Sequence, residues 1–302
     1  LVTSIDLDAV VAVDLANGNR SIVSGPSIGT GPDFISPQGI VIDGARALVA
    51  EPGLSSIIAV DLATGNRTVL SDASNGTGAA LQSPSGLLIE STRLIVTDLV
   101  GTLLAVDIFS GDRTVLASSS IDAGAPFRSR AIARLDNQNA LLTSGTPNAV
   151  LEVNLTTGAR TLISTNSPGG SPLLFPGLPV FNGNHALVME GVGSSVPRSL
   201  VSVDLTSGQR SIVSSSLMGT GPSFLLPRAM ALDGGRLLVT DGSLGAVMAV
   251  NLATGDRTIV SDSAIGTGLA LVSPGGIAID GGRALVLDAE RIVAVDLLTG
   301  NR

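Results

Sequence analysis

The sequence of 302 residues contains no cysteine, tryptophan, tyrosine or lysine, so all 17 basic residues are arginine, and it contains a single histidine. Because cysteine is absent, disulfides, catalytic thiols and cysteine metal sites are excluded. Because lysine is absent, Schiff-base chemistry and the lysine of a phosphate-binding loop are excluded as well. No apolar run is long enough to form a transmembrane helix.

Positive charge is also scarce, since the chain has 17 arginines and 25 acidic residues and its formal net charge is −8. Binding to nucleic acid or to anionic membranes depends on basic patches, so we predict no nucleic-acid partner and no membrane insertion. The chain begins at Leu1 and shows neither an initiator methionine nor a signal peptide, which indicates a processed or excised chain. We expect a secreted or periplasmic location.

The abundant residues are small and apolar: hydrophobic residues make up 44% of the chain, aromatic residues only 2%, and there are 37 glycines. This composition is typical of many short strands joined by tight turns. A motif close to Val-Asp-Leu-x-Thr-Gly-x-Arg recurs about every 47 residues. It begins at Val13, Val60, Val106, Val153, Val203, Val250 and Val295. Residues 1–20 and 283–302 therefore occupy the same phase of the repeat.

Each repeat predicts four strands, exemplified by residues 39–43, 46–51, 57–62 and 67–71. Asp43-Gly44 joins the first two strands, as expected for a two-residue hairpin, and Thr64-Gly65 lies between the last two. No stretch shows a sustained helical period. Four-stranded antiparallel units of this length indicate propeller blades, so we predict an all-β fold in which residues 1–302 form a single β-propeller domain.

The number of blades is ambiguous, because the count of predicted strands, 26, lies between the 24 of six blades and the 28 of seven. We favour six blades, one of them composed of strands from both ends of the chain. Seven blades, two of them incomplete, are the alternative. The duplicated terminal strands could also pair between molecules, which would give self-association.

The segment 273–288, Ser-Pro-Gly-Gly-Ile-Ala-Ile-Asp-Gly-Gly-Arg-Ala-Leu-Val-Leu-Asp, followed by Arg-Ile-Val-Ala-Val-Asp at 291–296, resembles an NHL-type repeat. It is also similar to the six-bladed group that includes gluconolactonase-like proteins, and the resemblance extends over nearly the whole chain. It implies a propeller fold and says little about activity, because the shared residues belong to turns and core. The chain departs from the lactonases in lacking recognisable calcium and acid/base motifs. It also carries Gly-Thr-Gly in its long inter-repeat loops at 29–31, 76–78, 219–221 and 266–268.

Two charged positions recur in nearly every repeat. An arginine begins each fourth strand, as at Arg67, and we expect it to pair within its own blade with the acid of the third strand, here Asp61. An acid ends most second strands, whereas the third complete repeat has Ser144. Hydrogen bonding to loop backbone is the simple interpretation of these acids, and a Ca²⁺ site is the alternative. They are Glu51, Asp98, Glu190, Asp241 and Asp288.

Arginines outside the repeated positions are the sharper functional candidates. Five of them fall in the third to fifth complete repeats, near the predicted mouth of the channel: Arg128, Arg130, Arg134, Arg198 and Arg228. Arginine clusters bind carboxylate, sulfate or phosphate in a bidentate manner, so we predict a site for an anion or acidic ligand. The lone histidine, His185, is predicted at the other end of its strand, and Gly25-Pro-Ser-Ile-Gly29 is a chance match to a nucleophile motif.

These observations predict a non-catalytic binding or scaffold propeller. Its protein, acidic small-molecule or carbohydrate ligand would lie at the channel mouth, on the loops between repeats and between second and third strands. The competing hypothesis is a metal-assisted hydrolase or lactonase of the gluconolactonase-like type, and a lyase on acidic polysaccharide is a third. We predict no catalytic residues and no cofactor for the binding protein, with Ca²⁺ the candidate for the hydrolase.

Overall fold

The computed structural model describes residues 1–14, 19–98, 101–119, 126–128, 132–165, 173, 176–177, 179–191, 198–289 and 291–302. Within these ranges the chain forms 26 short β-strands and one 3-10 helix, η1 (Pro52–Leu54). We find no helix in the described part of the chain with the length and apolarity that a membrane crossing requires.

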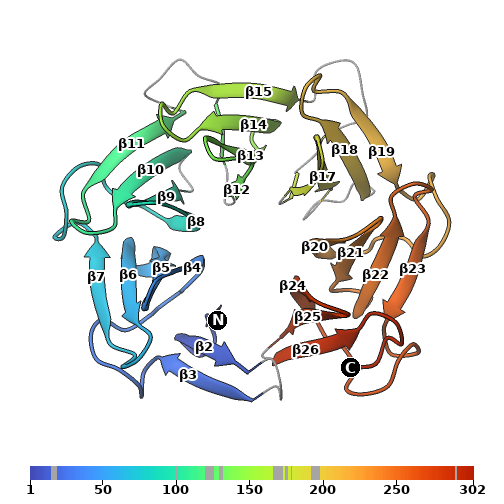
Figure 1. Ribbon diagram of the computed structural model, residues 1–302, viewed down its shortest axis with the longest axis horizontal. Coiled ribbons are helices and arrows are strands. Elements are labelled where there is room, and N and C mark those ends of the chain that lie inside the picture. The colour runs from blue at the N-terminus through green and yellow to red at the C-terminus, as the bar shows by residue number, and fades with distance from the viewer. Residues whose placement is uncertain are drawn as a thin grey trace. The chain divides into compact units, whose positions relative to one another are not determined.

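The strands form seven antiparallel sheets in chain order (Figure 1). The first sheet has three strands: β1 (Val2–Ser4), β2 (Ala9–Val13) and β3 (Arg20–Ser24). The second has four: β4 (Ile40–Asp43), β5 (Arg46–Glu51), β6 (Ser56–Asp61) and β7 (Arg67–Ser71). The third has β8 (Pro84–Glu90), β9 (Arg93–Asp98), β10 (Thr102–Asp107) and β11 (Arg113–Ser118).

The fourth sheet has β12 (Ile132–Arg134), β13 (Asn139–Gly145), β14 (Asn148–Asn154) and β15 (Arg160–Thr165). The fifth has β16 (Val180–Asn182), β17 (His185–Glu190), β18 (Ser199–Asp204) and β19 (Arg210–Ser214). The sixth has β20 (Pro227–Asp233), β21 (Arg236–Asp241), β22 (Ala246–Asn251) and β23 (Arg257–Ser261). The seventh has three strands: β24 (Pro274–Asp280), β25 (Arg283–Asp288) and β26 (Arg291–Asp296).

The fold is an all-β propeller, as predicted, and its sheets are the blades. The preference for six blades is wrong and the alternative of seven is confirmed: β1–β3 and β24–β26 are two separate three-stranded sheets rather than one composite blade. The physical reason is that the two ends of the chain occupy the same phase of the repeat. Each end holds its own second and third strands, and these pair locally, Thr3 with Val10 and Leu285 with Ala294.

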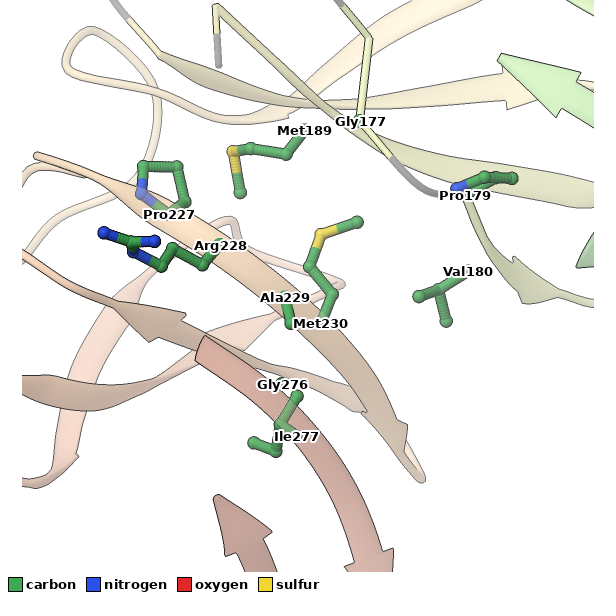
Figure 2. Close-up of a pocket in the computed structure, with 10 residues that line it drawn as sticks. All are labelled: Gly177, Pro179, Val180, Met189, Pro227, Arg228, Ala229, Met230, Gly276 and Ile277. Atoms are coloured by element: carbon green, nitrogen blue, oxygen red, sulfur yellow. The ribbon is translucent and has the colours of Figure 1, made fainter. Parts of the chain in front are cut away.

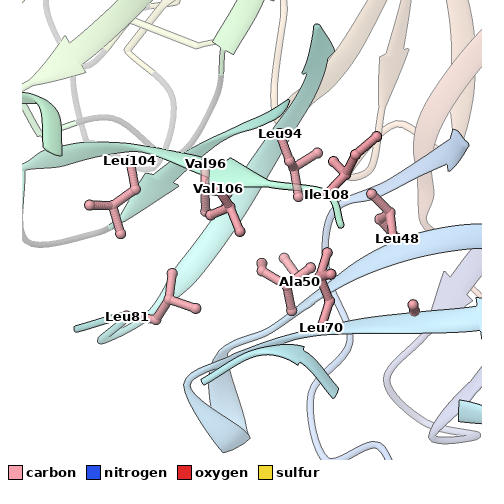
Figure 3. Packing of buried hydrophobic residues seen from close by; sticks show 11 residues of the cluster. Leu48, Ala50, Leu70, Leu81, Leu94, Val96, Leu104, Val106 and Ile108 are labelled. Atoms are coloured by element: carbon pink, nitrogen blue, oxygen red, sulfur yellow. The ribbon is translucent and has the colours of Figure 1, made fainter. Parts of the chain in front are cut away.

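The chain divides into two compact units, residues 1–147 with 151–162 and residues 148–150 with 163–302. We call them the first and second units. In the first unit, the second and third sheets pack through apolar side chains such as Leu48 and Ala50 of β5 and Leu94 and Val96 of β9 (Figure 3). Burying each such leucine or valine contributes roughly 1.5–3 kcal/mol.

In the second unit, the fifth, sixth and seventh sheets are successive neighbours (Figure 1). Leu238 of β21 packs with Ala284 and Val286 of β25, and Leu237 packs on the other face with Leu187 of β17. Successive residues of a strand point to opposite faces, so a strand between two sheets must be apolar at every position. This explains why the central strands show unbroken apolar runs.

Turn chemistry matches the sequence prediction. Gly44 joins β4 to β5 with φ of 57°, and Gly65 follows β6 with φ of 75°, conformations that favour glycine. The four predicted strands of this repeat agree with β4 to β7 to within one residue at each end.

Candidate functional site

In the second sheet, the arginine that begins the fourth strand binds the preceding sheet rather than its own. Arg67 at the start of β7 is buried, and its Nη1 donates to Ser24 Oγ at 2.9 Å and to the carbonyls of Gly25 and Ile28 at 3.0 Å. Asp61, its predicted partner, instead accepts from the backbone and hydroxyl of Thr64. The structural role stands, but the pairing within one blade is wrong, because the fork of the guanidinium fits the carbonyl-lined loop that follows β3.

The same contact recurs in other sheets. Arg113 donates to Ser71 Oγ and Arg257 donates to Ser214 Oγ, each in the sheet before its own. A loop phenylalanine covers the guanidinium of two of these arginines. The ring centroid of Phe34 lies 5.6 Å from Arg67 Cζ, and that of Phe224 lies 5.6 Å from Arg257 Cζ. These phenylalanines therefore pack against the arginines at the contacts between neighbouring sheets.

The Gly-Thr-Gly loops add hydrogen bonds to these contacts between neighbouring sheets. Thr77 donates from its backbone nitrogen and its hydroxyl to Asp112 Oδ1 of the next sheet, at 2.7 and 2.8 Å, and these bonds hold the pKa of Asp112 below its ordinary value. Gly78 has φ of 101°, and a Cβ there would lie 1.9 Å from the Arg113 carbonyl oxygen. The motif fastens one sheet to the next, which is why it repeats.

The acids that end second strands anchor loop backbone. Glu51 accepts from the nitrogens of Ile35 and Ser36 at 3.1 and 2.8 Å, and Asp241 accepts from Leu225 at 2.7 Å. The five acids are all buried: Glu51, Asp98, Glu190, Asp241 and Asp288. Where the fourth sheet has Ser144, its hydroxyl accepts from the backbone nitrogen of Arg128 at 2.8 Å, so a different side chain performs the same task. Among the described residues, no three histidine, aspartate or glutamate side chains gather as a metal ion would require.

Four of the five predicted ligand-binding arginines lie in the described ranges, and Arg130 lies outside them. Arg128, in the first unit, is exposed. Arg134 ends β12 in the same unit and donates to the carbonyls of Ile89 and Asp136, at 2.9 and 3.4 Å. Arg198, in the second unit, is half-buried just before β18. Arg228 lies near the start of β20 and lines the pocket described below, which the other three do not.

A β-bulge sets the position of Arg228. In the pairing of β20 with β21, Pro227 faces Asp241 and Ala229 faces Thr240, so Arg228 is the extra residue between them. A bulged residue is released from the ladder, and its side chain is re-aimed. Equivalent register shifts occur at Pro84 in β8 and Pro274 in β24, which makes this a regular feature at the start of first strands.

The pocket beside Arg228 has a volume of about 310 Å³ and lies wholly in the second unit. It is lined by residues before and within β16, at the end of β17, and in the first strands β20 and β24 (Figure 2). The lining comprises Gly177, Pro179, Val180, Met189, Pro227, Arg228, Ala229, Met230, Gly276 and Ile277. Across the view of Figure 2, Arg228 points to one side, Pro179 and Val180 lie at the other, and both methionines lie between.

The two methionines of this pocket are not among the residues predicted from the sequence, although the sequence contains a signal for them. All four methionines of the chain, at 189, 218, 230 and 248, fall within one stretch of about 60 residues. Flexible thioethers concentrate at adaptable binding surfaces. Met189 is buried and Met230 half-buried, and both belong to the apolar cluster beside the pocket.

The other two chemical candidates lie apart from this pocket. His185 begins β17 and approaches Asp204 of β18, with Nε2 3.6 Å from Oδ2, at the opposite end of the strand from the pocket residue Met189. Ser27, the central residue of the nucleophile-like motif, lies in the turn after β3, where Gly25 and Ile28 form an isolated bridge. It does not occupy the strand-to-helix elbow that such a nucleophile needs.

Neither a family model nor a curated protein matches the chain. Solved structures match it in fold. Virginiamycin B lyase from Staphylococcus aureus superposes with a TM-score of 0.69 at 13% identity, over 96% of this chain and 88% of the other. Hydrazine synthase from Kuenenia stuttgartiensis gives 0.65 at 16%, over 90% and 80%, and the computationally designed Ika8 protein gives 0.58 at 14%, over 87% and 71%. These identities support the propeller fold alone, and the finer resemblance to NHL-type and gluconolactonase-like proteins stays a prediction.

Proposed function

We propose that the protein is a non-catalytic binding propeller that takes a small anionic molecule into the pocket beside Arg228. One observation carries the proposal: Arg228 is exposed and lines a cavity, and within the described ranges its side chain makes no hydrogen bond and no ion pair. Arg128 is likewise exposed, and its side chain has no hydrogen bond or ion pair among the described residues, but it does not line this pocket.

The physical argument rests on the donors of Arg228. A guanidinium presents a planar fork of N–H groups that matches a carboxylate or sulfate in two parallel, charge-assisted hydrogen bonds. The chain carries a net charge of −8, and other arginines of the protein have acidic or carbonyl partners: Arg46 pairs with Asp43 at 2.8 Å, and Arg134 donates to the Ile89 carbonyl at 2.9 Å. Its position on a bulge next to an apolar wall leaves the fork available to a ligand.

The surroundings favour binding over catalysis. Among the residues that line the pocket, Arg228 is the one charged side chain, and none is a carboxylate, histidine or hydroxyl group. General acid–base chemistry needs a titrating group within hydrogen-bond reach of the reacting atom. The nearby acid Asp241 is occupied by loop nitrogens, those of Leu225 and Leu226.

Calorimetric titration tests the proposal with two carboxylates, octanoate and galacturonate. We expect at least one of them to bind the wild-type chain, and Arg228→Ala to weaken that binding about tenfold or more, as loss of a hydrogen-bonded charge pair predicts. Arg128→Ala is the matched control, because it also removes an exposed, unpaired arginine, and it should bind like wild type. Equal affinity in Arg228→Ala, or no binding of either anion, would show the proposal to be wrong.

A further inference from the structure

We infer that the ligand of this pocket is a monocarboxylate of about ten non-hydrogen atoms with an apolar body, rather than an acidic sugar. This inference rests on the proposed function, since it names the class of anion that binds beside Arg228. It follows from four features of the pocket: the composition of its lining, the number of charges on that lining, its volume and the placement of two glycines.

The lining excludes a hydroxylated ligand on energetic grounds. Apart from Arg228, every lining side chain belongs to glycine, proline, alanine, valine, isoleucine or methionine, and none of these donates a hydrogen bond. A sugar buried here would leave its hydroxyls without side-chain partners, at a cost of about 1–3 kcal/mol for each unsatisfied group. An alkyl or aryl body has no such cost and gains free energy from the apolar area that it buries.

The charge count favours a single carboxylate. Arg228 can satisfy both oxygens of one carboxylate through its fork. A second negative charge on the ligand would meet no cation among the lining residues. Because Figure 2 shows Arg228 at one side and Val180 at the other, the ligand would lie with its carboxylate at Arg228 and its body along the methionines.

The volume sets the size of the body. About 310 Å³ equals the liquid volume of roughly ten water molecules at ~30 Å³ each. A methylene group occupies a similar volume, so a chain of about eight to ten carbons fills the space. Pockets of this size lie at the lower end of the range for small-molecule sites. The thioethers of Met189 and Met230 can adapt to bodies of different shape.

Two glycines leave room for this arrangement. A Cβ on Gly242 would lie 2.7 Å from Arg228 Nε, so the guanidinium rests against bare backbone after β21. Gly276 lines the pocket in β24, and a Cβ there would meet only Leu287 Cβ at 3.7 Å and Leu287 Cδ2 at 4.0 Å, which is ordinary contact. A larger side chain at Gly276 can therefore be accommodated by the sheet while it occupies the pocket.

Titration of the wild-type chain with three matched probes tests the ligand class. Octanoate carries the charge and the apolar body, octanamide keeps the body without the charge, and galacturonate keeps the charge on a hydroxylated body. We expect octanoate to bind at least tenfold more tightly than either of the others. If galacturonate binds as well as octanoate through Arg228, the ligand class is wrong while the proposed function stands. If neither anion binds, the proposed function itself is wrong.

Filling the pocket gives a second, independent test. Gly276→Leu should reduce octanoate affinity at least tenfold. Gly275→Leu is the control, because Gly275 does not line the pocket and a Cβ there would meet only the Leu287 carbonyl oxygen, at 3.5 Å. Thermal melts of both variants establish that they fold. Undiminished octanoate binding by folded Gly276→Leu would overturn the assignment of the apolar body to this pocket, and the wild-type titrations decide the ligand class if that variant does not fold.

Discussion

Single arginines in this protein serve two opposite purposes, and their surroundings decide which. Arg67 is 4% exposed and surrounded by carbonyl oxygens and a serine hydroxyl of the preceding sheet. Arg228 is exposed, lies on a bulge and has no partner among the described residues. The first is a structural cation that holds two sheets together, and the second is the group that we assign to ligand binding.

Removing the buried guanidinium should therefore be costly. We expect Arg67→Ala to lower the free energy of unfolding by about 3 kcal/mol or more, because it empties a buried volume and removes the guanidinium hydrogen bonds to Ser24 Oγ and to the carbonyls of Gly25 and Ile28. Arg128→Ala removes an exposed arginine and should change the free energy of unfolding by less than about 0.5 kcal/mol. Urea denaturation measures both. A cost for Arg67→Ala as small as that of the control would contradict the role of this contact.

The sequence predicted the structural role of these repeated arginines but not their partners. Arg67 and Ser24 are 43 residues apart, so no local pattern relates them. The nearest acid in the repeat, Asp61, was the natural candidate, but the turn that follows it uses up its carboxylate. A short aspartate side chain satisfies nearby backbone nitrogens before it can reach a distant guanidinium.

The turns between third and fourth strands contain aspartates whose ionised form is stabilised by the fold. Their aspartates accept backbone and hydroxyl hydrogen bonds, such as the one from the Thr64 hydroxyl to Asp61, and these bonds lower the pKa below the ordinary value of 3.8. The aspartates that begin these turns and have a lowered pKa are Asp61, Asp107, Asp204 and Asp296, and Asp112 and Asp256 near the ends of two such turns have a lowered pKa as well. The folded state then binds protons less readily than the unfolded state, so these groups stabilise the fold above about pH 5 and lose that contribution as the pH falls through 3.8 and below.

Replacing all four aspartates by asparagine should preserve the fold and flatten this pH dependence. The protein already contains the neutral version of the turn, where Asn251 Oδ1 accepts from the nitrogens of Ala253 and Thr254 at 2.8 and 3.1 Å. We expect the urea midpoint of the variant to fall less between pH 5 and pH 3 than that of wild type. An unchanged slope would mean that other carboxylates govern acid unfolding.

Elements near the start of each first strand carry the variation that matters for function. The bulge recurs, but the residue at its extra position differs: Arg228 in β20 corresponds to Ser85 in β8 and Gly275 in β24. A comparison of the repeats in the sequence shows that Arg228 differs from the residues at the equivalent position of the other repeats. It could not show that this departure falls on a bulge, because the register shift is visible only in the pairing of β20 with β21.

At the scale of the whole molecule, the acids that end second strands bear on the metal hypothesis. Each of Glu51, Asp98, Asp241 and Asp288 accepts hydrogen bonds from loop nitrogens. A Ca²⁺ ion would have to displace those bonds and draw oxygens from several acids at once. We therefore expect the melting temperature to shift by less than about 1 °C when Ca²⁺ is added or chelated, since a ligand stabilises only the state that binds it. A large upward shift would favour the metal-assisted hydrolase.

Local patterns in the chain were sufficient to predict the propeller, the repeat of about 47 residues and the bounds of its strands, because hairpins and turns depend on residues that are close in sequence. Three features required the folded chain: the separate pairing of the terminal strands, the insertion of Arg67 into the preceding sheet, and the gathering of Met189, Arg228 and Ile277 around one pocket. Each depends on contacts between different repeats. Near-identical repeats offer many equivalent partners, so only the packing of one sheet against the next selects among them.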